Sequence, residues 1–184
     1  METKDSIRQQ IKNLKKSISE SNKKEATLLV ASAIEQLPCF KSASNILLYH
    51  SLPDELNTHS MIDKWSESKS IFLPRINNND LEILHANNTQ LGAFNIQEPV
   101  GSITVPLSKI DVAIIPGIAF DINGIRLGRG KGYYDRLLCQ NKVIKIGICY
   151  DFQLYNELPS TLHDIPMDII ITPKQTIITN HNIN

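Results

Sequence analysis

The first part of the chain alternates apolar and polar residues with the period of an α-helix. Between residues 4 and 37 apolar side chains return every three or four positions, and Ser19–Asn22 offers a break and a helix cap. In the first half, these apolar positions are Ile7, Ile11, Leu14 and Ile18. The pattern predicts two helices, the second of which ends at Pro38 because proline cannot continue a helix.

After Pro38 the pattern changes to short runs rich in β-branched residues. Six such runs lie at 45–50, 70–76, 81–86, 111–117, 143–150 and 167–173. Several are apolar at successive positions, as in strands buried on both faces, and helices are predicted between them at 57–68 and 131–140. The polar stretch 75–80 is typical of a hairpin turn, so the sheet is predicted to be mixed.

These elements predict an α/β fold with helices on both faces of the sheet. We expect one three-layer α/β/α domain over residues 1–184 with a mixed, mostly parallel sheet. The stretch 87–109 is interpreted as an excursion within that domain, since its periodicity is weak.

Composition narrows the functional class. The chain has 184 residues, and its 19 Lys and Arg balance its 19 Asp and Glu, so it lacks the overall positive field of a nucleic-acid-binding protein. Three scattered cysteines form no CxxC pair and are typical of reduced packing residues. The charged N-terminal segment has no apolar core and no run is long enough to span a membrane, so we expect a cytoplasmic protein without a membrane partner. We also expect a monomer that has no nucleic-acid partner.

The stretch 116–138, PGIAFDINGIRLGRGKGYYDRLL, combines glycines with cations and two adjacent tyrosines. Glycine lets the backbone approach a ligand closely, and crowded cations repel one another without an anionic partner. The cations are Arg126, Arg129, Lys131 and Arg136. A predicted strand enters the stretch and a helix beginning near Lys131 or Gly132 leaves it, which favours a phosphate site at the carboxyl edge of the sheet. A surface loop with solvated cations is the alternative.

Common phosphate-binding motifs do not fit this stretch. Gly128-x-Gly130-x-Gly132 is neither GxGxxG nor Walker A, since glycine rather than Ser or Thr follows Lys131. An acid directly behind these cations suggests a bridging divalent ion, because Mg²⁺ is held by one or two carboxylates plus phosphate oxygens. Asp135 is therefore a candidate Mg²⁺ ligand, and its alternative role is that of an acid favoured by the dipole of the helix start. The histidines show no zinc-ligand spacing.

The glycine-rich stretch resembles the signature of the 5-formyltetrahydrofolate cyclo-ligase family. Companion motifs of that family are matched in order by KDSIR, YHSLPDELNT, LPR, EP and HDIPMDIIIT, at 4–8, 49–58, 73–75, 98–99 and 163–172. The resemblance covers nearly the whole chain. It implies ATP- and Mg²⁺-dependent cyclisation of 5-formyltetrahydrofolate to 5,10-methenyltetrahydrofolate, with release of ADP and phosphate, through a phosphorylated formyl group.

The resemblance also assigns roles to residues. Those implied to bind ATP are Lys4, Arg8, Arg126, Leu127, Gly128, Arg129, Gly130, Lys131, Gly132, Tyr133 and Tyr134. Arg129, Lys131 and Tyr133 are implied to be catalytic, with the cations countering charge on the phosphoryl oxygens. His50, Glu55, Gly130 and Tyr133 are implied to contact the folate. Asp135 and Asp164 are implied to hold Mg²⁺. Asp168, which precedes a predicted buried strand, is a substitute ligand whose alternative role is that of a cap. Tyr150 is expected either to stack on a ligand ring or to close its strand.

Two other classes compete with this interpretation. An enzyme that handles a sugar phosphate or a CoA group would explain the anion loop, but not the acid pair or the cations at Lys4 and Arg8. An RNA-binding module would use RLGRGKGYY as a basic, stacking strip, and a steep salt dependence of RNA affinity would support it.

Overall fold

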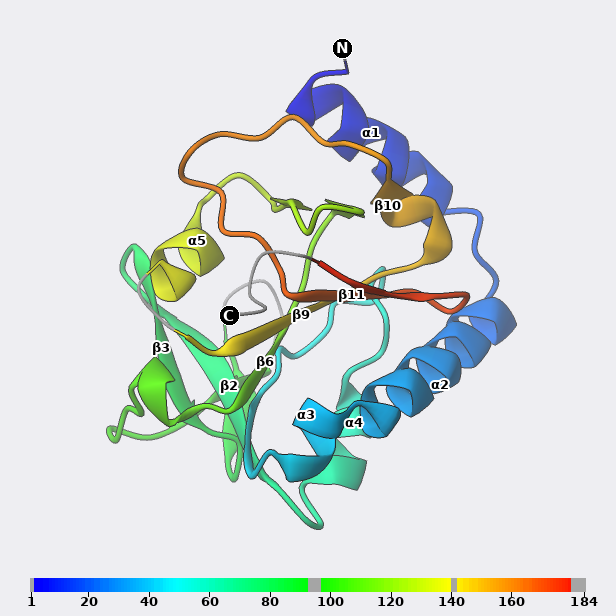
Figure 1. Cartoon of the computed structure of the whole chain (residues 1–184). Helices are drawn as coiled ribbons and strands as arrows, with labels where there is room; N and C mark the ends of the chain where they lie inside the picture. Colours follow the sequence, from blue (N-terminus) through cyan, green and yellow to red (C-terminus); the bar gives the residue numbers. More distant parts are fainter. Residues whose placement is uncertain (1, 93–96, 140–141, 180–184) are drawn as a thin grey trace.

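The computed structural model describes residues 2–92, 97–139 and 142–179, and its centre is a seven-stranded sheet in the order β12-β11-β9-β6-β1-β2-β3 (Figure 1). The strands are β1 (Asn45–Leu47), β2 (Ser70–Asn77), β3 (Asp80–His85), β6 (Val112–Ile115), β9 (Ile144–Ile148), β11 (Ile169–Ile171) and β12 (Thr176–Ile178). The five inner strands are parallel, whereas the edge strands β3 and β12 are antiparallel to their neighbours. The predicted mixed, mostly parallel sheet is confirmed.

The two N-terminal helices form where the periodicity predicts them. Helix α1 (Lys4–Lys15) begins with a capping box in which Thr3 and Ser6 bond each other's backbone N–H groups. Ser19 caps α2 (Glu20–Gln36) by accepting a hydrogen bond from the backbone of Asn22. Pro38 follows the end of α2 and starts the short helix α3 (Pro38–Ser42), which the sequence pattern did not predict.

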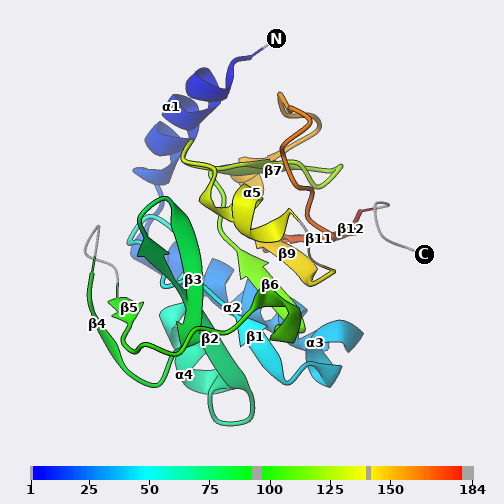
Figure 2. The ribbon, with the colours of Figure 1, turned by 90° about the vertical axis from the view of Figure 1, so that its left-hand side faces the viewer.

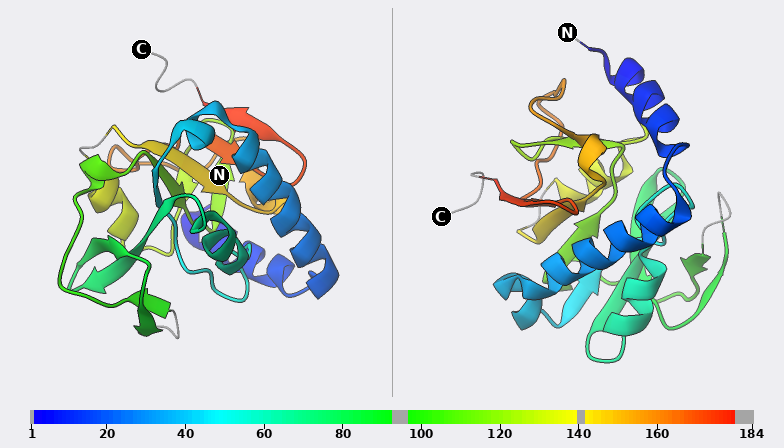
Figure 3. Two further views of the ribbon diagram at one scale, coloured as in Figure 1. Left: turned by 90° about the horizontal axis from the view of Figure 1, so that it is seen from below. Right: turned by 90° about the vertical axis from the view of Figure 1, so that its right-hand side faces the viewer.

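One face of the sheet is covered by α2, α3 and α4 (His59–Trp65) (Figures 1 and 3). Apolar side chains of these helices, including Val30, Ile34 and Trp65, pack with sheet residues such as Ile46 and Ile114 in one buried cluster. Removing this apolar surface from water stabilises the layer pairing by roughly 25 cal/mol per Å². The helix predicted at 57–68 is confirmed by α4.

The opposite face is covered by a more irregular layer. It holds the short helix α5 (Tyr133–Leu138), the 3₁₀ helix η2 (Leu107–Lys109) and a three-stranded sheet in the order β10-β7-β8 (Figure 2). The small sheet consists of β7 (Ala119–Asp121), β8 (Arg126–Leu127) and β10 (Leu154–Tyr155). Its strands have two or three residues each, too few for an alternating pattern to be visible in the sequence.

Phe120 joins the small sheet to the large one. Its ring is fully buried, and a Cβ added to Gly147 on β9 would lie 2.4 Å from that ring. A Cβ on Gly117 would meet the same ring at 2.6 Å. Glycine is therefore required at both positions, because any side chain would fill the space that Phe120 occupies.

The hairpin predicted at 75–80 is present between β2 and β3. Asn77 pairs with Asp80, and Asn78 between them adopts φ 54°, a left-handed conformation that asparagine tolerates. The stretch 87–109 contributes the strands β4 (Thr89–Leu91) and β5 (Gln97–Pro99), which pair with each other. Residue 140, at the end of the helix predicted over 131–140, lies outside the described residues.

The strand order creates a crevice between β1 and β6. After β1 the chain moves outward to β2 and β3, whereas after β6 it moves the other way to β9 and β11. The connections that leave these two neighbouring strands therefore diverge at their carboxyl ends. In open α/β sheets, such a reversal point is where ligands bind.

Candidate active site

A cavity of about 610 Å³ lies at this carboxyl edge. Residues that follow β1 and β6 line it, namely Tyr49, His50, Pro116, Gly117 and Ile118. The β2–β3 hairpin adds Pro74, Ile76 and Leu81 to the lining. Two further apolar residues, Leu52 and Leu127, and two acidic residues, Glu55 and Glu98, also line the cavity. The cavity is large enough for a drug-sized ligand and combines an apolar wall with a cationic one.

The glycine-rich loop forms the cationic wall. Gly130 and Gly132 adopt φ of +96° and +66°, conformations that other residues rarely take, so the loop turns tightly around the cavity. The loop follows β8 and not β6, because the β7–β8 hairpin intervenes between the predicted strand and the loop. Helix α5 begins at Tyr133 and is only six residues long, so the side-chain cations contribute more positive charge than the helix end.

Two cations reach the cavity from α1. Lys4 and Arg8 lie one helical turn apart on the same side of the helix, and both line the cavity. Arg8 Nε donates to the carbonyl oxygen of Gly128 at 3.0 Å, which ties the helix to the glycine-rich loop. Ile7 and Ile11 bury the other side of α1 against Leu127 and its neighbours. The helix is therefore held at the site by its apolar face and presents its cations to the cavity.

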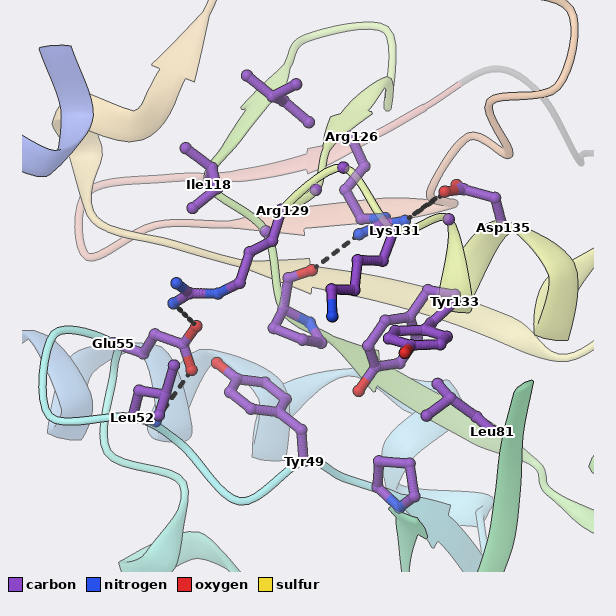
Figure 4. A pocket seen from close by; sticks show the side chains of 18 of the residues that line it. Tyr49, Leu52, Glu55, Leu81, Ile118, Arg126, Arg129, Lys131, Tyr133 and Asp135 are labelled. Atoms are coloured by element: carbon purple, nitrogen blue, oxygen red, sulfur yellow. Dashed lines mark hydrogen bonds and ion pairs between the residues drawn. The ribbon is translucent and has the colours of Figure 1, made fainter. Parts of the chain in front are cut away.

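Lys131 and Arg129 extend from the glycine-rich loop into the cavity (Figure 4). Arg129 Nη2 lies 2.9 Å from Glu55 Oε1, and Glu55 Oε2 accepts the backbone N–H of Leu52 at 3.0 Å. Tyr150 does not line the cavity, and its hydroxyl donates to the carbonyl oxygen of Glu55 at 3.2 Å. The residues expected to contact phosphate and folate therefore meet each other across the cavity.

Arg126 lies beneath the loop, with only 5% of its side chain exposed. Its Nη2 donates to both carboxylate oxygens of Asp135, at 2.9 and 3.0 Å, and Nη1 donates to the Pro116 carbonyl at 3.3 Å (Figure 4). The guanidinium lies 5.5 Å from the centre of the Tyr134 ring. Within the described residues, Arg126 Nε is buried without a hydrogen-bond partner. Asp135 is therefore the counter-ion of a buried arginine.

Asp164 also lines the cavity and is also paired. Lys4 Nζ lies 2.8 Å from its Oδ2, and the backbone N–H of Thr161 donates to the same oxygen at 2.7 Å. Burial, the largest single effect, acts to raise the pKa of Asp164, but the bonds from Lys4 and Thr161 hold it below its ordinary value. Asp164 is therefore ionised at neutral pH.

Asp168 has a different environment from the other two acids. It does not line the cavity, and its Oδ2 accepts the backbone N–H of Lys145 at 2.7 Å while Lys145 Nζ lies 2.9 Å away. The structure thus places Asp168 in a largely buried ion pair at the amino ends of β9 and β11, opposite the carboxyl edge that holds the cavity. Among the described residues, no three His, Cys, Asp or Glu side chains converge as a metal cluster would require.

His50 lines the cavity and stacks on His59, with 3.7 Å between the ring centres. His59 Nε2 lies 3.0 Å from the carbonyl oxygen of Ser51. Burial first and His59 second lower the pKa of His50 from 6.5 to about 4, against the opposing field of Asp63. At neutral pH, His50 is therefore an uncharged imidazole in the wall of the site.

Several wall residues were not predicted from the sequence. No role was assigned from the sequence to Tyr49, Pro74, Ile76, Leu81 or Ile118, and all five line the cavity. Each lies within or next to the carboxyl-terminal half of a strand or in the hairpin. Knowledge of the strand order would have identified these wall residues, because the order of strands in the sheet shows which strand ends lie next to each other.

A family model described as the 5-formyltetrahydrofolate cyclo-ligase family matches residues 1–173. The chain belongs to this family. A 5-formyltetrahydrofolate cyclo-ligase of Haemophilus influenzae is 31% identical over 178 residues, which cover 90% of this chain and 95% of the relative. The corresponding protein of Escherichia coli is 30% identical and covers 90% and 97% of the two chains. As a member of the cyclo-ligase family, the chain is an enzyme.

Solved structures agree with this assignment to the cyclo-ligase family. The 5,10-methenyltetrahydrofolate synthetase of Aquifex aeolicus superposes with a TM-score of 0.89 at 32% identity, over 98% of this chain and 95% of that one. A second synthetase, from Mycoplasma pneumoniae, has the same fold, with a TM-score of 0.77 at 23% identity over 92% and 98% of the chains. In the described residues, no helix has both the length and the apolar character that a membrane span requires.

Proposed function

We propose that this enzyme converts 5-formyltetrahydrofolate to 5,10-methenyltetrahydrofolate with consumption of ATP. The observation that supports this most directly is a cavity in which a cationic wall, from the glycine-rich loop and α1, faces a largely apolar wall that carries Glu55 and Glu98. A phosphate chain suits the first wall and a pterin ring suits the second. The family assignment and this geometry point to the same pair of substrates.

The reaction balances in two steps. The formyl oxygen attacks the γ-phosphorus, an O–P bond forms, the bond between the γ-phosphorus and the bridging oxygen breaks, and ADP leaves. N10 of the folate then attacks the formyl carbon, N10 loses its proton, and inorganic phosphate leaves with the former formyl oxygen. Positioning and charge neutralisation supply most of the catalysis of such a phosphoryl transfer.

The cations of the cavity have two kinds of role in this proposal. Lys131 and Arg129 extend into the cavity and counter the charge that spreads over the phosphoryl oxygens, with Tyr133 beside them. Lys4 and Arg8 reach the same phosphate chain from α1. The buried Arg126 acts from beneath the loop. The proposed nucleotide-binding residues Leu127, Gly128, Gly130, Gly132 and Tyr134 also line the cavity.

Glu55 and His50 are proposed to bind the pterin. A carboxylate accepts hydrogen bonds from an amino group and a ring nitrogen together, and Glu55 already accepts two donors in this structure. Binding of the pterin at Glu55 requires that Arg129 turn away from it, toward the phosphates. His50 adds an uncharged imidazole, which either donates or accepts one hydrogen bond.

Mg²⁺ is proposed to be held by Asp135 and Asp164 together with phosphate oxygens. Hard carboxylate oxygens are donors that Mg²⁺ prefers, and two carboxylates suffice when a nucleotide supplies further ligands. Both acids line the cavity, but Arg126 and Lys4 occupy them in this structure. Binding of the metal by both carboxylates would therefore require Arg126 and Lys4 to release them. When bound, it neutralises charge on the phosphates.

One assay tests the proposed function against its rivals. Protein, 5-formyltetrahydrofolate and Mg-ATP are mixed, and the absorbance of methenyl-folate is followed with ADP release. Product in a stoichiometry of one ADP per methenyl-folate supports the proposal. An enzyme of sugar-phosphate or CoA chemistry, or an RNA-binding protein, forms no methenyl-folate.

We also propose that the enzyme acts in the cytoplasm as a monomer, without a nucleic-acid or membrane partner.

A further inference from the structure

Arg136 lies outside the cavity and yet contacts two of its walls. It is on α5, which Figures 1 and 2 show beside the β2–β3 hairpin. Its Nε lies 3.0 Å from Asp80 Oδ1, and its Nη2 donates to the carbonyl oxygen of Asn79 in the hairpin turn. Its Nη1 donates to the carbonyl oxygen of Lys131 at 3.0 Å. One guanidinium therefore joins the hairpin to the glycine-rich loop.

The groups on either side of this bridge belong to the site. Ile76 and Leu81 flank the hairpin turn and line the cavity, as do Lys131 and Tyr133 on the other side. The Arg136 guanidinium also lies 5.4 Å from the centre of the Tyr133 ring. In Figure 4, Tyr133 and Leu81 lie on the same side of the cavity. The bridge thus connects the glycine-rich loop to the hairpin that carries part of the apolar wall.

We propose that Arg136 is a positioning residue for the reaction, and that it acts by holding the backbone of Lys131 against the hairpin. An arginine suits this role because its planar fork donates in several fixed directions at once, which a lysine ammonium does not. The proposal rests on the proposed function, because the step that it affects is the phosphoryl transfer at Lys131.

Loss of the Arg136 bridge should change the free energy of unfolding little, but it should change the order of the glycine-rich loop. The side chains of Arg136 and Asp80 are 47% and 72% exposed, so their ion pair adds little to the free energy of unfolding. The loop, in contrast, contains two residues with positive φ and depends on outside contacts for its conformation. Loss of the bridge should therefore loosen the loop without unfolding the protein.

The first experiment measures loop order without any activity. Hydrogen exchange of the wild type and Arg136→Ala is compared by mass spectrometry. Faster exchange in both 77–81 and 128–132, with unchanged exchange in α2, is the expected result. Lys64→Ala is the matched control, since it removes an exposed ion pair with Glu35 on the opposite face of the sheet. Exchange in the two segments that equals the wild type overturns the proposal.

The second experiment measures kinetics. Arg136→Ala should lower kcat on the order of tenfold, because a small displacement of a reacting group is costly, while the KM values of both substrates change less than about threefold. Asp80→Ala should lower kcat by a smaller factor and should add nothing in the Arg136→Ala background. Two effects that multiply, or a kcat within twofold of the wild type, contradict the positioning role.

The outcomes separate this inference from the proposed function. A wild type that forms no methenyl-folate disproves the proposed function, and the exchange experiment then still decides whether the bridge orders the loop. If Arg136→Ala does not fold, Arg136→Lys takes its place. That variant keeps the charge and the aliphatic stem but cannot reach Asp80 and the Lys131 carbonyl together, so the same loss of kcat is expected.

Discussion

Lys131 is the side chain at which a single truncation should cost the most turnover. It extends into the cavity from the glycine-rich loop (Figure 4). We expect Lys131→Ala to lower kcat on the order of a hundredfold, since an oriented cation beside a transferring phosphoryl group is worth a few kcal/mol. Circular dichroism should show an intact fold. Lys109→Ala, which truncates an exposed lysine far from the loop, serves as the control, and a Lys131 variant with near-wild-type kcat disproves the role.

Asp135 should show two separable effects when its charge is removed. Asp135→Asn leaves the buried Arg126 without a counter-ion, so the free energy of unfolding should fall on the order of 3 kcal/mol. The same variant should need more Mg²⁺ for half-maximal rate, and excess Mg²⁺ should recover part of that rate. Asp164→Asn is the comparison, because its partner Lys4 is 31% exposed and less stability is lost. A Mg²⁺ titration that overlays the wild type identifies Asp135 as a counter-ion alone.

The lowered pKa of His50 should reduce the free energy of unfolding in mild acid. Its pKa is about 4 in the folded chain, chiefly because of burial, whereas its ordinary value is 6.5. The unfolded chain therefore binds a proton first, and stability is lost as the pH falls from about 6.5 to 4. The lowered pKa of Asp164 causes losses only below this window, near its ordinary value of 3.8.

Urea midpoints at pH 7 and pH 5 measure the contribution of His50. The wild type should lose more stability between these two values than His50→Gln, because glutamine keeps a polar side chain but does not titrate. Equal losses in the two proteins would contradict the contribution of His50 to this pH dependence.

At the scale of elements, α1 carries the two cations, Lys4 and Arg8, that we propose to bind the nucleotide. Its inner face holds Ile7 and Ile11, and Arg8 bonds the carbonyl oxygen of Gly128. We expect Arg8→Ala to raise the KM for ATP with a smaller effect on kcat, since Arg8 contributes binding and not chemistry. Lys12→Ala, an exposed position on the same helix, should leave both values unchanged. A fall in kcat without a change in KM would assign Arg8 to the chemical step.

At the scale of the whole molecule, the contact between Phe120 and Gly147 holds the small sheet on the large one. Gly147→Ala puts a Cβ about where the Phe120 ring lies, 2.4 Å from its nearest atom. Overpacking of this kind costs about 1–3 kcal/mol, so the melting temperature should fall. Phe120→Leu in the Gly147→Ala background should recover part of the loss. If the double variant is less stable than the sum of the two changes predicts, the contact does not explain the requirement for glycine.

The order of elements and the class of fold were predictable from the sequence because they depend on local patterns. Helical spacing placed α1 and α2, and β-branched runs placed six of the seven strands of the large sheet, all but β12. The hairpin between β2 and β3 was visible in its polar turn. Motifs matched along nearly the whole chain also indicated the family, which the comparison over residues 1–173 confirms.

Pairings between distant residues were decided only by the tertiary structure. Arg129 and Glu55 are 74 positions apart in sequence, and nothing in either segment indicates that they form an ion pair. The same holds for Lys4 with Asp164, and for Arg136 with the turn at Asp80. The physical reason is that periodicity reports which face of an element is buried, whereas strand order decides which buried faces and which loop ends meet. The sequence therefore determined the chemical groups of the site, and the reversal of strand order between β1 and β6 determined where they come together.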